Sequence, residues 1–333
     1  MYQDFYSFHA MPFQLTPDSR FYFGSQEHRR AMAFLQYGLS QQEGFVVITG
    51  EIGAGKTMLV EHLLTQLDQN EYVVARVMTT QLGGYDTLCV IAGAFGIASD
   101  RLDKGHLISR VREFFATTRA QGRNVLVIVD EAQSLSLEAV EELRMLSNLT
   151  AGPQAPFQGI LLGQPELRIA LSSPETQQLR QRVIASCHLG ALNAEDTRKY
   201  VEHRLIRVGW NNDPVFSDGA FEKIHSHSGG IPRRINALCS RLLLLGYLEE
   251  RHVIEAAAVA DVASEMAAEL GAPGITTGTA PQAPDAQSIQ VPGAVELQSR
   301  LARVERATIR HDKAIVRVLD LALKYLPAQS AKP

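Results

Sequence analysis

Residues Gly50 to Thr57 match the pattern G-x-x-x-x-G-K-[ST] of a phosphate-binding loop at every fixed position. An apolar run, Phe45–Thr49, precedes them and predicts a buried strand, and Met58–Leu64 predicts the helix that follows. This strand–loop–helix order matters, because a glycine-rich turn without a ligand can show the same composition. We therefore expect a phosphate site directly after the first strand of a parallel sheet.

The residue types of this loop predict separate tasks. Glycines allow successive backbone N–H groups to point inward at phosphate oxygens, and the following helix adds the positive end of its dipole. We expect Lys56 to reach the β- and γ-phosphates of ATP and the Thr57 hydroxyl to ligate Mg²⁺. The expected nucleotide-binding residues are Gly50, Glu51, Ile52, Gly53, Ala54, Gly55, Lys56, Thr57 and Met58.

A second apolar run, Val125–Val129, ends in two acids, Asp130 and Glu131. Ligands bind at the carboxyl ends of the strands in open parallel sheets, so both acids are expected beside the phosphates. Asp130 would hold Mg²⁺ directly or through water, and Glu131 would orient the attacking water. Taken alone, an Asp-Glu pair after a strand indicates only an acidic helix start, but together with the loop it indicates a catalytic pair.

Four apolar runs are continuous rather than alternating, which is typical of parallel strands covered on both faces. Helical stretches between them predict βαβ units and hence an α/β fold with a doubly wound parallel sheet, as in P-loop NTPases. Before the first run, an aromatic-rich opening leads into a helix predicted at Glu27–Leu39. The four runs are Phe45–Thr49, Tyr72–Met78, Val125–Val129 and Gly159–Leu162.

The chain divides into four predicted segments: a core at residues 1–190, a small all-helical lid domain at 191–268, a linker at 269–293 and a C-terminal helix at 294–333. Residues 271–293 hold four Gly and four Pro, a composition that predicts a flexible linker. After it, apolar residues at a 4-3-4 spacing suggest a coiled-coil or docking helix, although a solvated amphipathic helix fits equally well. The lid helices are expected at Glu195–Val208 (with Asn193 as its N-cap), Ser217–Ser228, Pro232–Tyr247 and Arg251–Glu269.

Composition narrows the class of protein. The net charge of −4 argues against nucleic-acid binding without removing it, since arginines cluster locally in the lid. Cys89, Cys187 and Cys239 lie far apart, which disfavours a disulfide or zinc framework. We find no signal peptide, and the apolar stretch Leu242–Leu248 is too short for a transmembrane segment. A cytoplasmic protein is expected, with peripheral attachment at the inner membrane as an alternative.

Three arginines are candidates for contacts to phosphate. Arg233 begins a predicted helix right after Gly229-Gly230, where a cation opposes the helix dipole and therefore suggests an anionic partner. Arg180 and Arg182 follow the predicted sheet and could reach a phosphate across a subunit boundary, although ordinary surface positions would explain both. His225 and His227 are two residues apart on a predicted helix, so we interpret them as solvated rather than as metal ligands.

With these features in this order, the chain resembles the AAA+ ATPases of the general secretion pathway protein A type. Within that type it is similar to secretion ATPases associated with exosortase and exopolysaccharide loci. The resemblance covers about residues 1–268 and includes short motifs outside the phosphate loop. These motifs are the opening Met1 to Asp18, Tyr37-Gly38-Leu39, Gly163-Gln164-Pro165-Glu166-Leu167, Asn193-Ala194-Glu195-Asp196-Thr197 and Gly229-Gly230-Ile231-Pro232-Arg233.

The resemblance implies roles for residues that spacing alone does not assign. It makes Lys56 and Thr57 the Walker A pair and Asp130 and Glu131 the Walker B pair. Gln164 would be the sensor 1 residue, Arg182 the arginine finger and Arg233 the sensor 2 residue. The base would lie between the N-terminal segment and the lid, which suggests as its neighbours Phe13, Phe23 and His28.

The resemblance also implies a function: a Mg²⁺-dependent ATPase, acting as a homo-oligomer, that powers or regulates export of a polysaccharide or protein across the cell envelope. Its partners would be membrane-associated export or polysaccharide-assembly proteins, contacted through residues 294–326. Two alternatives stay open. One is a DNA-binding ATPase resembling transposition helper proteins, and the other is a nucleotide-gated scaffold with little hydrolysis.

Overall fold

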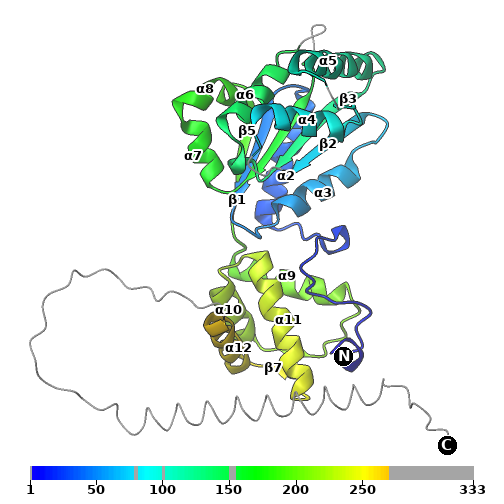
Figure 1. Cartoon of the computed structure of the whole chain (residues 1–333). Coiled ribbons are helices and arrows are strands. Elements are labelled where there is room, and N and C mark those ends of the chain that lie inside the picture. Colours follow the sequence, from blue (N-terminus) through cyan, green and yellow to red (C-terminus); the bar gives the residue numbers. More distant parts are fainter. Residues whose placement is uncertain (1, 79–81, 100–101, 150–154, 270–333) are drawn as a thin grey trace, which may run out of the picture.

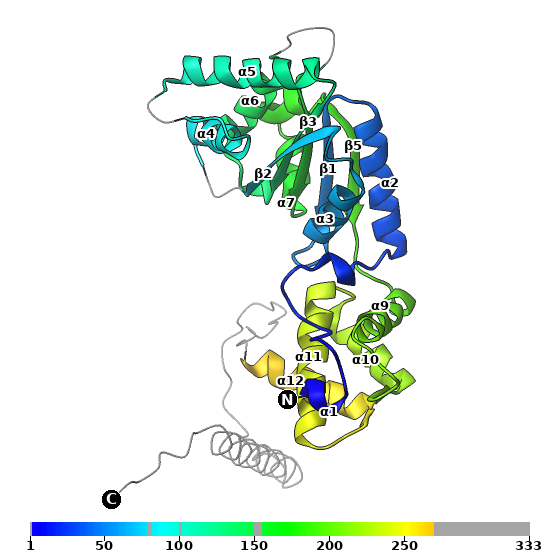
Figure 2. The same cartoon turned by 90° about the vertical axis from the view of Figure 1, so that its right-hand side faces the viewer.

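The computed structural model describes residues 2–78, 82–99, 102–149 and 155–269, which form two lobes joined at a narrow waist (Figures 1 and 2). One lobe is a layered α/β domain and the other is built mainly of helices. Beyond Glu269, the predicted linker and the predicted C-terminal helix lie outside the described residues.

The α/β lobe contains five parallel strands in the order β2-β3-β4-β1-β5. In the register of the central strands, Val47 pairs with Leu161 of β4 on one side and with Ser186 of β5 on the other. This arrangement confirms the predicted doubly wound α/β fold. The strands are β1 (Phe45–Gly50), β2 (Tyr72–Met78), β3 (Asn124–Asp130), β4 (Gln158–Gly163) and β5 (Val183–Leu189).

Strand β5 was not among the four predicted strands. It is an edge strand, and its residues alternate between buried Ala185, Cys187 and Leu189 and exposed Ser186 and His188. A search for continuous apolar runs finds only strands that are covered on both faces, so it misses a half-exposed edge. The interpretation of residues 179–183 as lying past the sheet was therefore wrong.

Helices cover both faces of this sheet (Figure 2). On one face, α2 and α3 pack through aliphatic side chains against Val46, Ile48 and Ile128 of the strands. On the other face, α4, α5 and α6 pack against Val47, Val127 and neighbouring side chains. The helices are α2 (Gln26–Ser40), α3 (Lys56–Gln66), α4 (Gly84–Ala94), α5 (Lys104–Ala120), α6 (Leu137–Leu146) and the short α7 (Glu166–Ser172) and α8 (Gln177–Arg180), with 3-10 turns at Ala132–Ser134 and Pro174–Thr176.

The lid domain contains the four predicted helices and one small addition. Asn193 caps α9 by accepting a hydrogen bond from the backbone N–H of Asp196, as predicted. Two parallel two-residue strands, β6 (Val215–Phe216) and β7 (Val253–Ile254), join the helices, so the expectation of an all-helical domain was wrong in this detail. Because Val253 and Ile254 form β7, the last helix starts at Ala256 and not at the predicted Arg251. The helices are α9 (Ala194–Ile206), α10 (Asp218–Ser228), α11 (Pro232–Leu248) and α12 (Ala256–Glu269).

The chain starts on the lid. Residues 2–23, which we name the N-terminal strap, include α1 (Tyr2–Phe5) and a 3-10 turn at Ser19–Phe21. Tyr6, Phe8 and Phe13 of the strap are buried in the hydrophobic core of the lid. Burying one such side chain contributes about 1.5–3 kcal/mol, so the strap is firmly held. The strap thus packs with the lid, although the sequence division groups it with the α/β domain.

Candidate nucleotide site

The phosphate-binding loop connects β1 to α3 and has the backbone shape that its glycines predict. Gly53 and Gly55 have φ angles of +83° and +103°, a region that side chains with a Cβ rarely adopt. A Cβ on Gly53 would also lie 2.3 Å from the Cβ of Arg233 in the lid. The loop is therefore placed directly against the first turn of α11.

Lys56 is buried inside the loop. Its Nζ donates hydrogen bonds to the carbonyl oxygens of Gly50, at 2.7 Å, and of Glu51, at 3.1 Å. Burial lowers the pKa of Lys56, while the nearby charges of Glu131 and Asp130 act in the opposite direction. The ammonium group is thus held between the loop backbone and the two acids that follow β3.

The two parts of the predicted Mg²⁺ site lie together. The Thr57 hydroxyl on the first turn of α3 donates to Asp130 Oδ2 at 2.9 Å. Both groups present hard oxygen donors, which suit Mg²⁺, and Mg²⁺ commonly takes its other ligands from substrate phosphates and water. Within the described ranges no group of three His, Cys, Asp or Glu residues could hold a metal by itself. The donor set therefore fits a metal that arrives with a nucleotide.

Glu131 follows Asp130 in a left-handed backbone conformation, with a φ angle of +52°. Its Oε2 accepts hydrogen bonds from Gln133 Nε2, at 2.6 Å, and from Gln164 Nε2, at 3.1 Å. Burial raises the pKa of Glu131, but the two amide donors and Lys56 outweigh it, so the pKa lies below its ordinary value. Glu131 is consequently a carboxylate with a fixed orientation at neutral pH.

Gln133 was not predicted from the sequence. Its amide bridges two predicted residues, because Oε1 also accepts from the backbone N–H of Gln164 at 3.0 Å. Gln133 thereby ties the end of β4 to the acids after β3. The only sequence signal is its position two residues after the Asp-Glu pair.

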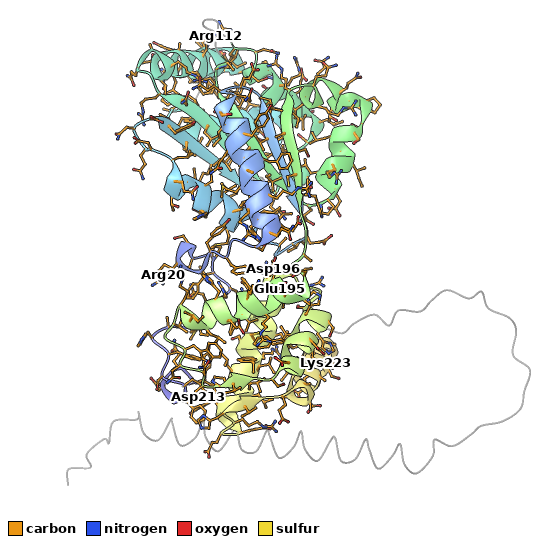
Figure 3. All side chains as sticks on the ribbon, turned by 180° about the vertical axis from the view of Figure 1, so that it is seen from behind. Arg20, Arg112, Glu195, Asp196, Asp213 and Lys223 are labelled. Atoms are coloured by element: carbon orange, nitrogen blue, oxygen red, sulfur yellow. The ribbon has the colours of Figure 1, made fainter. Side chains whose placement is uncertain are left out.

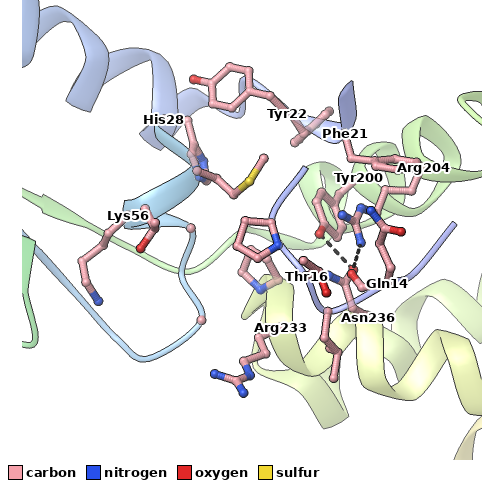
Figure 4. Close-up of a pocket in the computed structure, with 18 of the residues that line it drawn as sticks. Gln14, Thr16, Phe21, Tyr22, His28, Lys56, Tyr200, Arg204, Arg233 and Asn236 are labelled. Carbon is pink, nitrogen blue, oxygen red and sulfur yellow. Dashed lines mark hydrogen bonds between the residues drawn. The ribbon is translucent and has the colours of Figure 1, made fainter. Parts of the chain in front are cut away.

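A cavity of about 410 Å³ opens beside the loop, between the α/β domain, the lid and the strap (Figure 4). Of the three residues predicted as neighbours of the base, Phe23 and His28 line this cavity, whereas Phe13 is buried in the core of the lid. The lining residues are Gln14, Leu15, Thr16, Pro17, Phe21, Tyr22, Phe23, His28, Ile52, Gly53, Gly55, Lys56, Thr57, Met58, Glu131, Tyr200, Arg204, Pro232, Arg233 and Asn236.

The lid wall of this cavity contains a buried arginine that the sequence did not indicate. The Arg204 guanidinium lies 4.8 Å from the ring centre of Phe21 in the strap and 5.5 Å from that of Tyr200. Its Nη1 donates to the carbonyl oxygen of Gln14 at 3.3 Å, and burial lowers its pKa. Tyr200 donates to Asn236 Oδ1 at 2.9 Å (Figure 4). Arg204 thus connects α9 to the strap, and its only signal was the i, i+4 spacing from Tyr200.

Two contacts join the lid to the α/β domain near the loop. The backbone N–H of Arg233, at the start of α11, donates to the carbonyl oxygen of Gly53 at 3.2 Å. On the other side, Asp196 Oδ2 accepts from the backbone N–H of Gln26 at 3.3 Å, and Figure 3 shows Asp196 at the waist. The predicted sensor 2 position is therefore next to the phosphate loop.

Arg182 lies far from this site within its own chain. Its guanidinium bonds the carbonyl oxygen of Ser147 at 3.2 Å and the side chain of Asn148, at the end of α6. Its carbonyl oxygen accepts from Phe45, the first residue of β1, whereas the phosphate loop follows the last residue of that strand. The six residues of β1 place the two ends about 20 Å apart, so Arg182 could act only on a neighbouring copy.

The histidines of α10 differ from their prediction in one respect. His225 Nδ1 lies 3.0 Å from the hydroxyl oxygen of Thr197, so the interpretation of His225 as solvated was wrong. His227 is exposed, as predicted. The hydrogen bond holds α10 against α9 and gives His225 a structural position.

None of the helices that the structure describes combines the length and apolar character needed to cross a bilayer.

Residues 39–171 match the family model described as an AAA domain. General secretion pathway protein A of Aeromonas hydrophila is 37% identical over 256 residues, which is 76% of this chain and 46% of that protein. The chain thus spans about half the length of this relative.

Solved structures of other proteins share this fold. The ADP form of the Aeropyrum pernix ORC2 protein aligns with a TM-score of 0.58 at 18% identity, covering 78% of this chain and 73% of that chain. The Thermotoga maritima RuvB branch migration motor aligns with a TM-score of 0.50 at 17% identity, covering 72% and 69%. Residues 39–171 of this chain therefore form an AAA domain, and 76% of the chain is similar to general secretion pathway protein A.

Proposed function

We propose that the protein binds ATP with Mg²⁺ in the cavity at the waist and hydrolyses it there. The hydrogen bond between Thr57 and Asp130 carries this proposal, because it brings the loop and the strand acids to one point. The backbone of residues 50–58 and the Lys56 ammonium would hold the phosphates. Bound Mg²⁺ would neutralise charge on the phosphate oxygens, held by Thr57 and Asp130.

Glu131 would accept a proton from the attacking water. Its lowered pKa keeps it ionised at neutral pH, and Gln133 and Gln164 hold its Oε2 in one orientation. Gln164 lies between the catalytic carboxylate and the end of β4, so it could respond to the γ-phosphate. These contacts support the roles of base and sensor for Glu131 and Gln164.

Arg233 would bind phosphate from the lid side. Its backbone already contacts Gly53 of the loop, and its side chain lines the cavity (Figure 4). A nucleotide with a γ-phosphate would favour the arrangement in which lid and loop stay together, because only that arrangement offers both contacts. Hydrolysis would then change the position of the lid.

A homo-oligomer would supply the last catalytic group. Arg182 and Arg180 both lie at the end of the sheet opposite the loop, where they could reach a neighbouring copy. Arg182 is the finger implied by the family, but its guanidinium is bonded to Ser147 and Asn148, whereas Arg180 ends α8 as an exposed residue. We therefore include both arginines in the test.

At the level of the cell, we propose that this ATPase powers or regulates an envelope export system for a polysaccharide or a protein. The 37% identity to general secretion pathway protein A supports this proposal. A cytoplasmic protein attached peripherally at the inner membrane, with export or polysaccharide-assembly proteins docking on residues 294–326, would fit that role.

The central experiment measures ADP release against protein concentration with MgATP. A homo-oligomer that completes its site in trans gives a specific activity that rises with concentration. We test Arg180→Ala and Arg182→Ala separately. The variant that lacks the trans-acting arginine should no longer show a specific activity that rises with protein concentration. Wild-type protein that neither binds nor hydrolyses MgATP would contradict the proposal, and stimulation by DNA would favour the DNA-binding alternative.

A further inference from the structure

His28 lines the cavity but belongs to none of the phosphate-binding motifs. It lies in the first turn of α2 and is 5% exposed. Ser25, the N-cap of this helix, accepts a hydrogen bond from the His28 backbone N–H at 3.2 Å. The same hydroxyl lies 2.7 Å from His28 Nδ1. If the ring hydrogen of the neutral imidazole sits on Nε2, then Nδ1 is an acceptor and the Ser25 hydroxyl donates to it.

The Nε2 side of the ring faces the phosphate-binding loop. A Cβ built on Gly55 would lie 2.8 Å from His28 Nε2, so the ring and the loop backbone are in direct contact. The imidazole also interacts with the backbone of Ala54, and this interaction favours the protonated ring. A backbone group with that effect is a carbonyl oxygen, which accepts the ring N–H. His28 therefore holds the Ala54 carbonyl.

This contact determines the direction of a neighbouring N–H group. The Ala54 carbonyl and the Gly55 N–H belong to one planar trans peptide unit, so they point in opposite directions. With the carbonyl on the side of His28, the Gly55 N–H is directed away from His28. The backbone around Gly55, with a φ angle of +103°, has few steric restraints of its own against a peptide flip.

We propose that His28 is a positioning residue, which holds the Ala54–Gly55 peptide so that the Gly55 N–H faces the bound phosphates. The inference rests on the proposed nucleotide site and adds a residue to it. The neutral ring is maintained by burial, which lowers the pKa of His28 to about 4. Tyr22 of the strap packs edge-on against the His28 ring, at 6.1 Å between ring centres, so the strap helps to keep His28 in place.

The test compares two substitutions of similar size, His28→Gln and His28→Leu. Glutamine can place an amide N–H near the position of Nε2, whereas leucine fills the space without a donor. We expect the Kd for MgATP to rise about tenfold in His28→Leu, as for the loss of one buried hydrogen bond, and to stay within about threefold of wild type in His28→Gln. At saturating MgATP, kcat should change little in either variant.

A matched control is His62→Leu. His62 stacks on Tyr22, the same ring that packs against His28, at 3.8 Å between ring centres. It lies on α3 and does not line the cavity. It should leave the Kd unchanged. Unfolding temperatures without nucleotide show whether each variant is folded.

Three results would overturn the proposal: unchanged affinity in His28→Leu, equal weakening in His28→Gln and His28→Leu, or a changed preference for ATP over GTP. A changed preference would mean that the ring touches the base instead of the loop. All three comparisons need a wild type that binds MgATP. Failure of the wild type to bind would instead reject the proposed nucleotide site, so the two proposals fail in different ways.

Discussion

The two walls of the cavity are built on different principles. The α/β wall includes residues of the contiguous phosphate-binding loop, between Ile52 and Met58, and Glu131 after β3, whose neighbour Asp130 bonds Thr57. The wall formed by lid and strap includes the rings of Phe21 and Tyr200, which pack around the buried cation of Arg204. The first wall has the chemistry to bind phosphates, whereas the second has the shape and apolar character that suit a base. The comparison suggests that catalysis depends on the first wall and lid position on the second, with Arg233 as the phosphate contact from the lid.

The strongest test of this comparison removes the ammonium group of Lys56 from the α/β wall, the wall that would bind phosphates. Lys56→Ala should abolish nucleotide binding, because Lys56 is the cation held inside the loop. Stabilisation by MgATP, about 2.7 kcal/mol at a concentration 100 times the Kd, should disappear from a thermal melt. Lys223→Ala, on the exposed side of the lid (Figure 3), is the control and should keep it. Retained stabilisation in Lys56→Ala would contradict the assigned loop.

The next test separates binding from hydrolysis on the same wall. Glu131→Gln removes the carboxylate but retains a side chain of the same size. We expect ADP release to fall by about 10²- to 10⁴-fold while the Kd for MgATP stays near that of wild type. Equal ADP release by Glu131→Gln and wild type would show that Glu131 is not the base, and slow release by both would favour the scaffold alternative.

A substitution on the lid wall should affect stability more than chemistry. Arg204→Met keeps much of the buried volume but loses the contacts with Phe21 and the Gln14 carbonyl. We expect the free energy of unfolding to fall by about 1–2 kcal/mol and the unfolding temperature of the lid and strap to fall with it.

The control for this substitution is Arg207→Met, because Arg207 is the exposed C-cap residue that follows α9. Its effect on the free energy of unfolding should stay within about 0.5 kcal/mol. If Arg204→Met instead reduced kcat as strongly as Glu131→Gln, the division of labour between the walls would be incorrect.

The smallest effect is expected at the junction between the walls. Asp196→Ala removes one exposed hydrogen bond, to the backbone N–H of Gln26. We expect a loss of less than about 1 kcal/mol in the free energy of unfolding and a change in the Kd for MgATP within about threefold. Glu195→Ala, the neighbouring exposed acid in Figure 3, serves as control. A large loss of binding in Asp196→Ala alone would show that this contact determines the position of the lid.

The α/β domain and the phosphate-binding wall of the cavity could be predicted from local sequence patterns. Four strands that are covered on both faces leave continuous apolar runs, and the loop residues are contiguous, so local pattern suffices. Asp130 and Glu131 could be placed because the carboxyl ends of parallel strands meet at one edge.

The edge strand, the packing of the strap and the contacts between separate elements became visible only in the tertiary structure. Edge strand β5 is half exposed, so its pattern is weak, and the aromatic opening could have packed on either lobe until its rings were seen buried in the lid. Arg204, Gln133 and the contact of His28 with Ala54 join residues from separate elements. Such contacts arise from the packing of whole domains, and the spacings of Arg204 and Gln133 in the sequence do not specify them.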